Sequence, residues 1–318
     1  MRIPRMKLLY NLGSLWRAAL PKVLFQRQLH NLLNQPSFVD DEVLNARIVY
    51  YNKLDSLSTC SENAVLLKNF KLAGRSSAYF FDTQIHTRYF PDHLKADFLF
   101  GDITYVPTSP SIVKSRPIAS GNEYSVLLNL DRYRHFNFIH DPIPFSQKRN
   151  VLVWRGDISE RKQERLLFLE RFYEHPLCDL GSSNLWLPNP QWQKPFMSIK
   201  EQLAYKYILC LEGIDVATNL KWVMSSNSVP VMPRPRFETW FMEGTLRPGY
   251  HYVEIQDDFS DLEEKLAYYN QHPKEAERIV AQAHSHVRQF LDSDGERFLA
   301  LKVLERYFLM TGQQIFNI

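Results

Sequence analysis

Short apolar segments alternate with longer segments of apolar and polar residues through the second half of the chain. The short segments lie at 151–154, 175–181, 207–211, 229–232 and 251–255. Each is too short for a typical helix and ends in polar or turn-forming residues, so each predicts a strand. The segments between them have the apolar spacing of helices. This alternation is typical of a doubly wound parallel sheet with helices on both faces, and it predicts an α/β fold.

The starts of several helices have a recognisable spacing. Three residue pairs match the capping box: Asp157 with Glu160, Ser198 with Glu201, and Ser260 with Glu263. In this motif the first side chain accepts a backbone N–H three residues later, and the acid at that position bonds back. We therefore expect helices to start next to each pair. Two further helices, roughly 274–292 and 295–310, are expected to close the chain.

The first half of the chain has a weaker pattern. Residues 38–75 predict mainly helix, and strands are expected at 76–81, 96–100 and 125–130. The following segment, 131–150, is polar and contains two prolines, which favours a connection between domains. A chain of 318 residues is long enough for two domains of ordinary size. We place these domains at 1–148 and 149–318, with the closing helix able to pack back on the first.

Charge and cysteine content exclude some classes of protein. A formal net charge of +3 is small, and the chain has no nucleic-acid-binding signature, so a nucleic-acid partner is not expected. The three cysteines lack the spacing of a metal site and suit a reducing, cytoplasmic compartment. Asp292-Ser-Asp294 is better explained as a helix cap, and His284 and His286 would face different directions on a helix. We therefore expect no bound metal.

The first 28 residues alternate basic and apolar side chains. They contain no apolar run long enough for a transmembrane helix and no pattern of signal-peptide cleavage. One interpretation is a helix that lies on an anionic membrane surface. The other is an amphipathic helix packed on the body of the protein. The sequence leaves both open.

Two strand ends are predicted to bind an anion. After the strand at 207–211 the chain turns at Gly213, and a helix begins near Thr218. Free backbone N–H groups and the positive end of the helix dipole then point to the carboxyl edge of the sheet, where a diphosphate would bind. The strand at 151–154 is followed by Arg155 in a similar position. Arg155 is either a phosphate or carboxylate clamp or part of a surface salt bridge.

Asp102 is the candidate acid of the first half. It follows the expected strand at 96–100, the usual location of a catalytic group in an open α/β sheet, although a turn or a helix cap would also explain it. Lys114 and Arg116 lie in a proline-punctuated loop and could hold an acidic ligand. The alternative for these two cations is an ordinary solvated loop.

A series of ordered motifs resembles glycosyltransferase family 90, which includes the CAP10 proteins, the protein O-glucosyltransferases and the bacterial lipopolysaccharide A proteins. The motifs are Trp154-Arg-Gly156, Lys206 to Gly213, Ala217-x-Asn-Leu-Lys221, the run that starts at Ser226, Phe237-Glu-Thr-Trp-Phe241, Tyr250-His-Tyr-Val253 and Asp258 to Leu262. The resemblance extends from about residue 98 to 290. It implies a GT-B-like arrangement of two facing Rossmann-like domains around a cleft, with the donor on the C-terminal half and the acceptor on the N-terminal half.

The resemblance also implies a reaction and roles for single residues. It implies inverting, metal-independent transfer from a UDP-sugar, with no cofactor besides that donor, and Asp102 resembles the general base. The residues that resemble donor contacts are Arg155, Gly156, Gly213, Thr218, Asn219, Lys221 and Glu238. Arg155 and Lys221 are implied to contact the diphosphate, and Glu238 the ribose hydroxyls.

One residue departs from the family pattern. Eukaryotic members have an arginine two residues before the lysine, where this chain has Asn219. A neutral amide cannot make the same bidentate, charge-assisted contact with a phosphate. We therefore expect Lys114, Arg116 or Arg155 to carry more of the charge.

The N-terminal stretch and the absence of secretory features favour the bacterial branch of the family. The expected function is transfer of a hexose or pentose to a hydroxyl of a lipopolysaccharide core or a related glycan, at the cytoplasmic face of the inner membrane. The expected partners are a UDP-sugar and a glycan or glycolipid acceptor, with peripheral membrane contact through residues 1–28. The alternative is a protein of the same fold that binds a glycan or a nucleotide sugar with weak catalysis.

Overall fold

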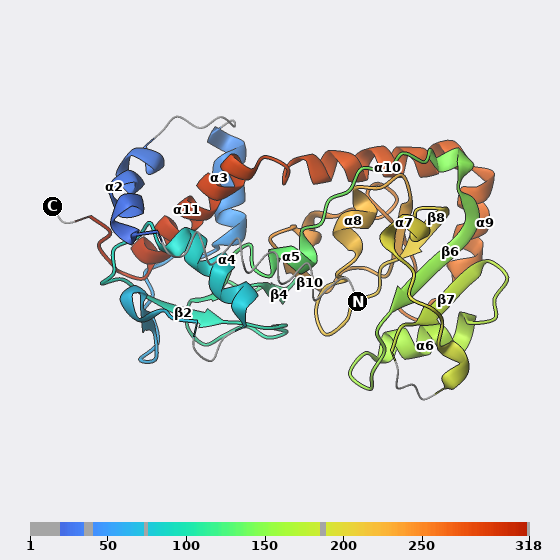
Figure 1. Ribbon diagram of the computed structural model, residues 1–318, viewed down its shortest axis with the longest axis horizontal. Helices are drawn as coiled ribbons and strands as arrows, with labels where there is room; N and C mark the ends of the chain where they lie inside the picture. The colour runs from blue at the N-terminus through green and yellow to red at the C-terminus, as the bar shows by residue number, and fades with distance from the viewer. Residues whose placement is uncertain (1–19, 35–40, 73–75, 185–188, 317–318) are drawn as a thin grey trace. The chain divides into compact units, whose positions relative to one another are not determined.

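The computed structural model describes residues 20–34, 41–72, 76–184 and 189–316 (Figure 1). The chain forms two compact units. Unit 1 contains the residues up to Arg134 together with Phe237–Phe241 and Phe290–Ile318, and unit 2 contains His135–Arg236 and Met242–Gln289. The chain therefore passes between the units repeatedly, since both Phe237–Phe241 and the closing segment belong to unit 1. The assignment of acceptor and donor to two facing domains stays a prediction.

A parallel sheet forms the centre of the described part of unit 2. Its strands are β6 (Arg149–Gly156), β7 (Cys178–Ser182), β8 (Tyr205–Leu209), β9 (Val229–Met232) and β11 (Val253–Glu254). Their order is β11-β9-β8-β6-β7, so the chain steps from β6 to β7 and then returns to the other side of β6 with β8. Each strand predicted for this region is confirmed, as is the parallel α/β arrangement.

Helices cover this sheet and close its core (Figure 1). They are α6 (Gln163–Phe172), α7 (Ile199–Gln202), α8 (Leu220–Met224), α9 (Leu262–Gln271) and α10 (Pro273–Arg288). Phe168 of α6, Leu266 of α9 and Ile279 of α10 belong to one buried cluster with Leu152 of β6 and Val231 of β9. A parallel sheet with both faces covered needs apolar residues on both sides of its strands. This explains why β8 is buried along its whole length.

Two of the capping predictions concern helices α7 and α9. The capping box of Ser198 and Glu201 is confirmed, with both of its reciprocal hydrogen bonds present. The prediction for Ser260 and Glu263 is wrong, because α9 begins one residue later and Asp261 precedes it without a side-chain cap. The Ser260 hydroxyl instead donates to the side chain of Gln256, at 2.9 Å. The Ser260 hydroxyl thus binds a nearby side chain and does not cap the helix.

The third capping prediction, for Asp157 and Glu160, is also wrong. Helix α6 begins at Gln163, and Lys162 precedes it without a side-chain cap. The Asp157 carboxylate pairs with the Lys162 ammonium instead of a backbone N–H. The loop after β6 is therefore longer than predicted, and its basic residues lie closer to the start of the helix.

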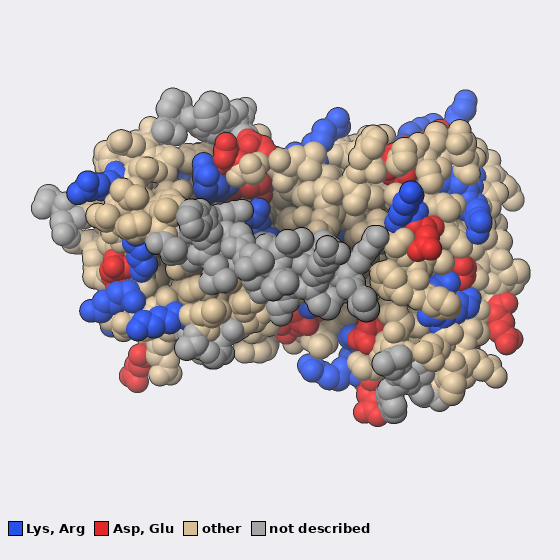
Figure 2. Space-filling view, in the orientation of Figure 1, with Lys and Arg blue, Asp and Glu red and all other residues tan. Residues whose placement is uncertain are grey.

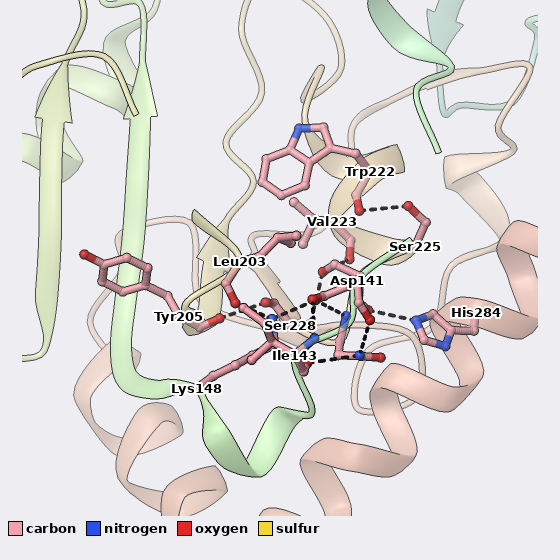
Figure 3. A network of polar contacts seen from close by, with 12 residues as sticks. Asp141, Ile143, Lys148, Leu203, Tyr205, Trp222, Val223, Ser225, Ser228 and His284 are labelled. Carbon is pink, nitrogen blue, oxygen red and sulfur yellow. Dashed lines mark hydrogen bonds and ion pairs between the residues drawn. The ribbon is translucent and has the colours of Figure 1, made fainter. Parts of the chain in front are cut away.

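A buried polar network fixes the segment that enters unit 2 (Figure 3). The Asp141 carboxylate accepts hydrogen bonds from Lys148 Nζ at 2.7 Å and from the Asn227 backbone N–H at 2.8 Å. The Asn227 amide donates to the backbone carbonyls of Asp141 and Ile143, at 2.9 and 3.0 Å. Lys148 also donates to the Leu203 carbonyl. Because buried polar groups need partners, this network ties the entering segment to the amino ends of β8 and β9.

Unit 1 contains a mixed sheet with the order β1-β2-β3-β5. The strands are β1 (Val65–Leu66), β2 (Lys95–Leu99), β3 (Ser111–Val113) and β5 (Ser125–Leu127). Strands β2, β3 and β5 are parallel, and β1 is antiparallel to β2. The strands predicted at 96–100 and 125–130 are confirmed. A separate antiparallel pair joins β4 (Ser115–Pro117) to β10 (Phe237–Thr239).

The helices of unit 1 include one that was predicted as a strand. They are α2 (Lys22–Leu33), α3 (Asp41–Tyr51), α4 (Ser77–Thr87) and α11 (Ser293–Met310). The apolar run at 76–81 lies in α4, where Phe80 packs against Phe70 with ring centroids 5.3 Å apart. A short apolar run cannot be told from a buried helix segment by periodicity alone. Within 38–75, the described α-helix is α3, so that segment is less helical than predicted.

The two predicted closing helices are confirmed as α10 and α11. Helix α11 contacts α2, α3 and α4 and buries Leu304, Tyr307 and Phe308 among them. It therefore contributes to the core of unit 1. One-turn elements complete the fold: α5 (Arg132–His135), η1 (Leu67–Asn69), η2 (Phe145–Gln147), η3 (Pro190–Trp192) and η4 (Glu243–Thr245).

The basic N-terminal stretch is described only from Leu20 onwards. In α2, Leu29 and Leu33 face inward, whereas Val23 and Leu24 are about half exposed. The predicted membrane contact of residues 1–28 lies mostly outside the described residues. Among the helices that the structure describes, none combines the length and the apolar character that a bilayer crossing requires.

Candidate active site

The carboxyl edge of the sheet in unit 2 contains a topological switch point between β6 and β8. The connection after β6 leads to β7 on one side, and β8 continues toward β9 on the other. The loops that follow β6 and β8 therefore diverge and leave room for a ligand between them. Both predicted anion-binding strand ends, the one before Asp157 and the one before Gly213, lie at this switch point.

The two predicted glycines both lie close to side chains of the protein, and the contact is much tighter at Gly156 than at Gly213. A Cβ at Gly156 would lie 2.3 Å from the ring of Trp154. A Cβ at Gly213 would lie 3.2 Å from Nη2 of Arg165 and 3.9 Å from Cε of Lys162. Gly156 thus makes room for an indole ring, and Gly213 lets the loop after β8 approach two basic side chains of the loop and helix after β6.

Arg155 forms an ion pair with Asp179 across β6 and β7. Its Nη2 lies 2.7 Å from Oδ1 of Asp179, and its side chain is only 6% exposed. Burial alone would raise the pKa of Asp179, but hydrogen bonds from Arg155, Tyr205 and Lys194 lower it to about 2. Nε of Arg155 has no acceptor within the described part of the chain. A role as a phosphate clamp would require this ion pair to open.

Lys221 and Asn219 are also engaged within unit 2. The Lys221 ammonium is fully buried in α8 and pairs with the Glu243 carboxylate. The Asn219 amide donates to the Leu209 carbonyl at 2.9 Å and so joins the start of α8 to the end of β8. Thr218, just before it, is half-buried. The predicted diphosphate contact of Lys221 would require a buried ion pair to separate.

The structure brings Arg165 to the switch point, a residue that the sequence analysis missed. Its guanidinium donates to the backbone carbonyls of Asp157, Leu211 and Glu212 at 2.9, 3.0 and 3.0 Å. It also lies over the ring of Trp154, 5.7 Å from its centroid. Arg165 therefore connects the loops after β6 and β8. The sequence feature that could have identified Arg165 is its position as a basic residue in the first turn of α6, the helix that follows β6.

A cluster of charged side chains lies next to the switch point. Arg236 binds Glu212 through its backbone N–H and its Nε, both at 3.0 Å, and its Nη2 lies 2.5 Å from Glu164. Basic and acidic side chains are also interspersed on the described surface of unit 2 that faces the viewer in Figure 2. This face therefore has no extended region of a single charge.

Asp102 lies at the carboxyl edge of the sheet in unit 1. It follows β2, while Lys114 follows the adjacent parallel strand β3, so the two side chains meet at one edge. The Lys114 Nζ lies 2.5 Å from Oδ1 of Asp102, and the Arg134 Nη2 lies 3.6 Å from the same atom. The Asp102 side chain is 28% exposed, whereas Lys114 is buried. Lys114 therefore orients a carboxylate that solvent can reach.

Arg116 and Glu238 form an ion pair inside unit 1. Both are buried, with Arg116 Nε 2.7 Å from Oε1 of Glu238. The Tyr50 hydroxyl also donates to Glu238, and Arg116 donates to the backbone carbonyls of Tyr50 and Tyr51. The pair thus fixes β10 to β4. The predicted acceptor contact of Arg116 and ribose contact of Glu238 would both require it to break.

The candidate metal motifs have other contacts. Asp292 caps α11 by accepting the Asp294 backbone N–H at 3.1 Å. His284 lies 2.8 Å from the Ser226 carbonyl oxygen, whereas His286 packs against the ring of His251. Within the described ranges, no group of three or more His, Cys, Asp or Glu side chains has the geometry of a metal site.

Comparison with known proteins adds an independent line of evidence. The sequence model of glycosyl transferase family 90 matches residues 132–311. The O-glucosyltransferase LpsA of Dichelobacter nodosus is 44% identical over 268 residues, which cover 84% of this chain and 83% of that protein. Protein O-glucosyltransferase 3 of Rattus norvegicus is 26% identical over 166 residues, 50% of this chain and 32% of that protein. O-glucosyltransferase rumi of Drosophila melanogaster is 23% identical over 185 residues, 54% of this chain and 44% of that protein.

The family match and the fold agree. The matched residues include the complete parallel sheet of unit 2 and the loops at its switch point, where Arg165 and Gly213 meet. The similarity to the bacterial protein extends over most of both chains. Both findings support the function class expected from the sequence motifs, a glycosyltransferase. The chain therefore belongs to glycosyl transferase family 90.

Proposed function

We propose that this glycosyltransferase moves a hexose or pentose from a UDP-sugar to a hydroxyl of a lipopolysaccharide core or a related glycan. The observation that carries the proposal is the position of Asp102, a solvent-accessible carboxylate oriented by Lys114 at the carboxyl edge of a parallel sheet. Glucose is the first sugar to test, because relatives of the chain are named O-glucosyltransferases. The reaction would take place at the cytoplasmic face of the membrane.

Asp102 would act as the general base of this reaction. Its carboxylate accepts the proton of the acceptor hydroxyl while the oxygen attacks the anomeric carbon of the sugar. The bond between that carbon and the diphosphate oxygen breaks, and UDP leaves with the negative charge. Attack opposite the leaving group inverts the anomeric configuration. The Lys114 ammonium is a positioning group, since it holds Oδ1 of Asp102 and so orients a carboxylate that is partly exposed to solvent.

The proposed transfer needs no metal ion. The charge of the departing diphosphate must be stabilised, and protein cations can supply that stabilisation in a site from which water is excluded. The switch point of unit 2 offers basic side chains for this role, among them Arg165, which backbone carbonyls of the loops after β6 and β8 hold in place. Activity in EDTA tests this part of the proposal. If activity is lost in EDTA and restored by manganese, the transfer is metal-dependent.

The test of the proposal is UDP release by the full chain. Wild-type protein is incubated with UDP-glucose, UDP-galactose or UDP-xylose, and UDP release is measured alongside Asp102→Asn. Loss of a general base lowers the rate by about 10²- to 10⁴-fold, so the variant should show that decrease with unchanged UDP affinity. Asp294→Asn is the matched control, because its side chain is exposed and lies at the start of α11.

The outcomes separate the alternatives. Release that is equal in wild type and Asp102→Asn removes Asp102 as the base. Binding of a UDP-sugar without release, with every acceptor glycan supplied, would favour a protein that binds nucleotide sugars with weak catalysis. Absence of both binding and release for all three donors would contradict the UDP-sugar proposal.

A further inference from the structure

Helix α5 brings two arginines to the carboxyl edge of the sheet in unit 1. It follows β5, which runs parallel to β3 and β2, so it lies at the same edge as Asp102. Arg134 of this helix reaches the proposed base, with Nη2 3.6 Å from Oδ1 of Asp102, and it also pairs with Asp131 at 3.0 Å. Residues two apart on a helix face different directions, so the side chain of Arg132 leaves α5 on another side.

Arg132 has no carboxylate partner in the described part of the chain. Its backbone N–H donates to Oδ2 of Asp82 on α4, at 3.0 Å, which places the residue next to that helix. The guanidinium forms no ion pair with a described residue, and its buried Nε has no acceptor among them. The side chain is half-buried. Because removing a cation from water without a partner is unfavourable, the charge of Arg132 favours a bound anion.

Three further side chains in this part of unit 1 have polar atoms without partners. Thr83 and His86 are neighbours on α4, and Asn129 follows β5. Within the described residues, Oγ1 of Thr83, Nδ1 of His86 and Oδ1 of Asn129 are buried and make no hydrogen bond. These residues, the polar trio of unit 1, are at most 8% exposed. Folded proteins leave few buried polar atoms unsatisfied, so the polar trio indicates a place where a polar ligand or ordered water binds.

The charged groups that act on His86 are basic. Burial, together with the nearby charges of Arg132 and Arg297, lowers the pKa of His86 to about 3. Arg297 pairs with Asp294, at 3.2 Å, so of these two arginines Arg132 is the one without a compensating acid among the described residues. A neutral imidazole therefore lies near an uncompensated guanidinium. This combination suits a ligand with one acidic group and several hydroxyl groups, because the cation binds the acid and the neutral side chains bind hydroxyls.

We propose that Arg132 and the polar trio form a subsite of unit 1 that binds an acidic sugar unit of the acceptor glycan through its phosphate or carboxylate group. This inference rests on the proposed transfer and names the class of its acceptor. Its position supports it, since these residues all belong to unit 1 and the same short helix reaches Asp102 through Arg134. An acceptor held there has its acidic group beside α4 and α5, on the side of the molecule that carries the proposed base.

The experiment compares acidic and neutral sugars on the full chain. Wild type, Arg132→Gln, Arg132→Lys and the control Arg278→Gln are titrated with glucose 6-phosphate, glucuronate, glucose and inorganic phosphate, and binding is followed by ligand-detected NMR. Arg278 is exposed on α10. A hydrogen bond between charged groups should make wild type bind the two acidic sugars about 10- to 150-fold more tightly than glucose. Arg132→Gln should lose this preference, Arg132→Lys should keep part of it, and Arg278→Gln should keep all of it.

The affinity for UDP separates this inference from the proposed function. Arg132→Gln should bind UDP as wild type does. If wild type binds UDP but does not prefer acidic sugars, or if Arg132→Gln keeps the preference, the inference is overturned while the proposed function stands. If wild type binds acidic sugars but not UDP, the UDP-sugar proposal is wrong and the subsite remains.

Two further outcomes are decisive. If wild type binds inorganic phosphate as tightly as glucose 6-phosphate, the subsite takes a free anion, and its assignment to the acceptor is wrong. If Arg132→Gln does not fold, as loss of UDP binding would show, Arg132→Lys decides instead. Lysine cannot make the bidentate contact of arginine, so an undiminished preference for acidic sugars in that variant would overturn the inference.

Discussion

At the scale of single residues, the cations singled out in the sequence share one property in the structure. Lys114, Arg116, Arg155 and Lys221 are all buried next to an acid. Removing a charge from water is unfavourable unless a partner compensates it, so such residues occur in pairs. The sequence shows the cation but not its partner, because the acid is distant in the chain. At Asp102 the pair orients a carboxylate that is partly exposed to solvent.

The Arg116–Glu238 pair leads to a prediction about stability. Glu238→Gln removes the negative charge and leaves Arg116 buried without compensation, which should lower the free energy of unfolding by about 3 kcal/mol or more. Denaturant unfolding followed by circular dichroism measures the change.

The control for this prediction is Glu263→Gln, whose side chain is 66% exposed next to His175. Loss of that exposed pair should change the unfolding free energy by less than about 1 kcal/mol. The double variant Arg116→Met with Glu238→Leu should recover part of the loss, because neither charge remains. Equal effects of the two Glu→Gln substitutions would show that the buried pair does not stabilise unit 1.

At the scale of elements, local signals predicted strands better than helix starts. The strands of unit 2 agree with the prediction because each combines an apolar run with turn-forming residues. Of the predicted caps, only the pair at Ser198 and Glu201 forms. Asp157 and Ser260 instead bind Lys162 and Gln256. Nearby side chains compete for the capping group, and spacing alone does not show which partner is preferred.

The buried polar network of Asp141 and Asn227 leads to a prediction about the segment that enters unit 2. Asn227→Ala removes two hydrogen bonds to the backbone carbonyls of Asp141 and Ile143, which lie in the segment that enters unit 2. Leaving buried carbonyls without donors should lower the free energy of unfolding by roughly 1–3 kcal/mol. Amide hydrogen exchange should also become faster for residues 139–148 than for β6.

The matched control for Asn227→Ala is Asn31→Ala, at an exposed position of α2. It should leave both measurements near the wild-type values. Exchange in 139–148 that does not change in Asn227→Ala would show that the other contacts of Asp141 and Lys148 hold the segment without Asn227.

At the scale of the whole molecule, the buried His86 and the half-buried His251 predict how the free energy of unfolding depends on pH. Burial lowers the pKa of His86 in unit 1 to about 3, and that of His251 in unit 2 to about 4. Both are neutral when folded and gain a proton on unfolding below about pH 6.5, so the unfolded chain binds more protons. The free energy of unfolding should therefore fall as pH decreases from about 6.5 to 4, by about 3 kcal/mol for His86.

Melting temperatures measured from neutral pH down to about 4 test this effect. His86→Gln should flatten the pH dependence, since it removes one of the two groups. Asp179 acts at lower pH, because its pKa of about 2 lies below the unfolded value and its contribution is lost as pH falls toward 2. A wild-type melting temperature that stays constant between pH 6.5 and 4 would contradict the neutral state of both histidines.

The sequence by itself determined the family, the α/β class and the parallel strands of unit 2. These depend on local apolar runs and on ordered motifs, which are properties of consecutive residues. It also placed Gly213 and the end of the strand before Asp157 at one edge of the sheet. It did not identify Arg165, because no short motif contains this residue together with the loop that it binds.

Only the tertiary structure decided which charges are compensated. Arg116 meets Glu238 because β10 returns to pair with β4, and Lys221 meets Glu243 through the fold of unit 2. Arg165 becomes available at the switch point because its neighbours there are backbone carbonyls rather than carboxylates. The physical reason is that electrostatic compensation depends on distance in space, which the order of residues along the chain does not contain.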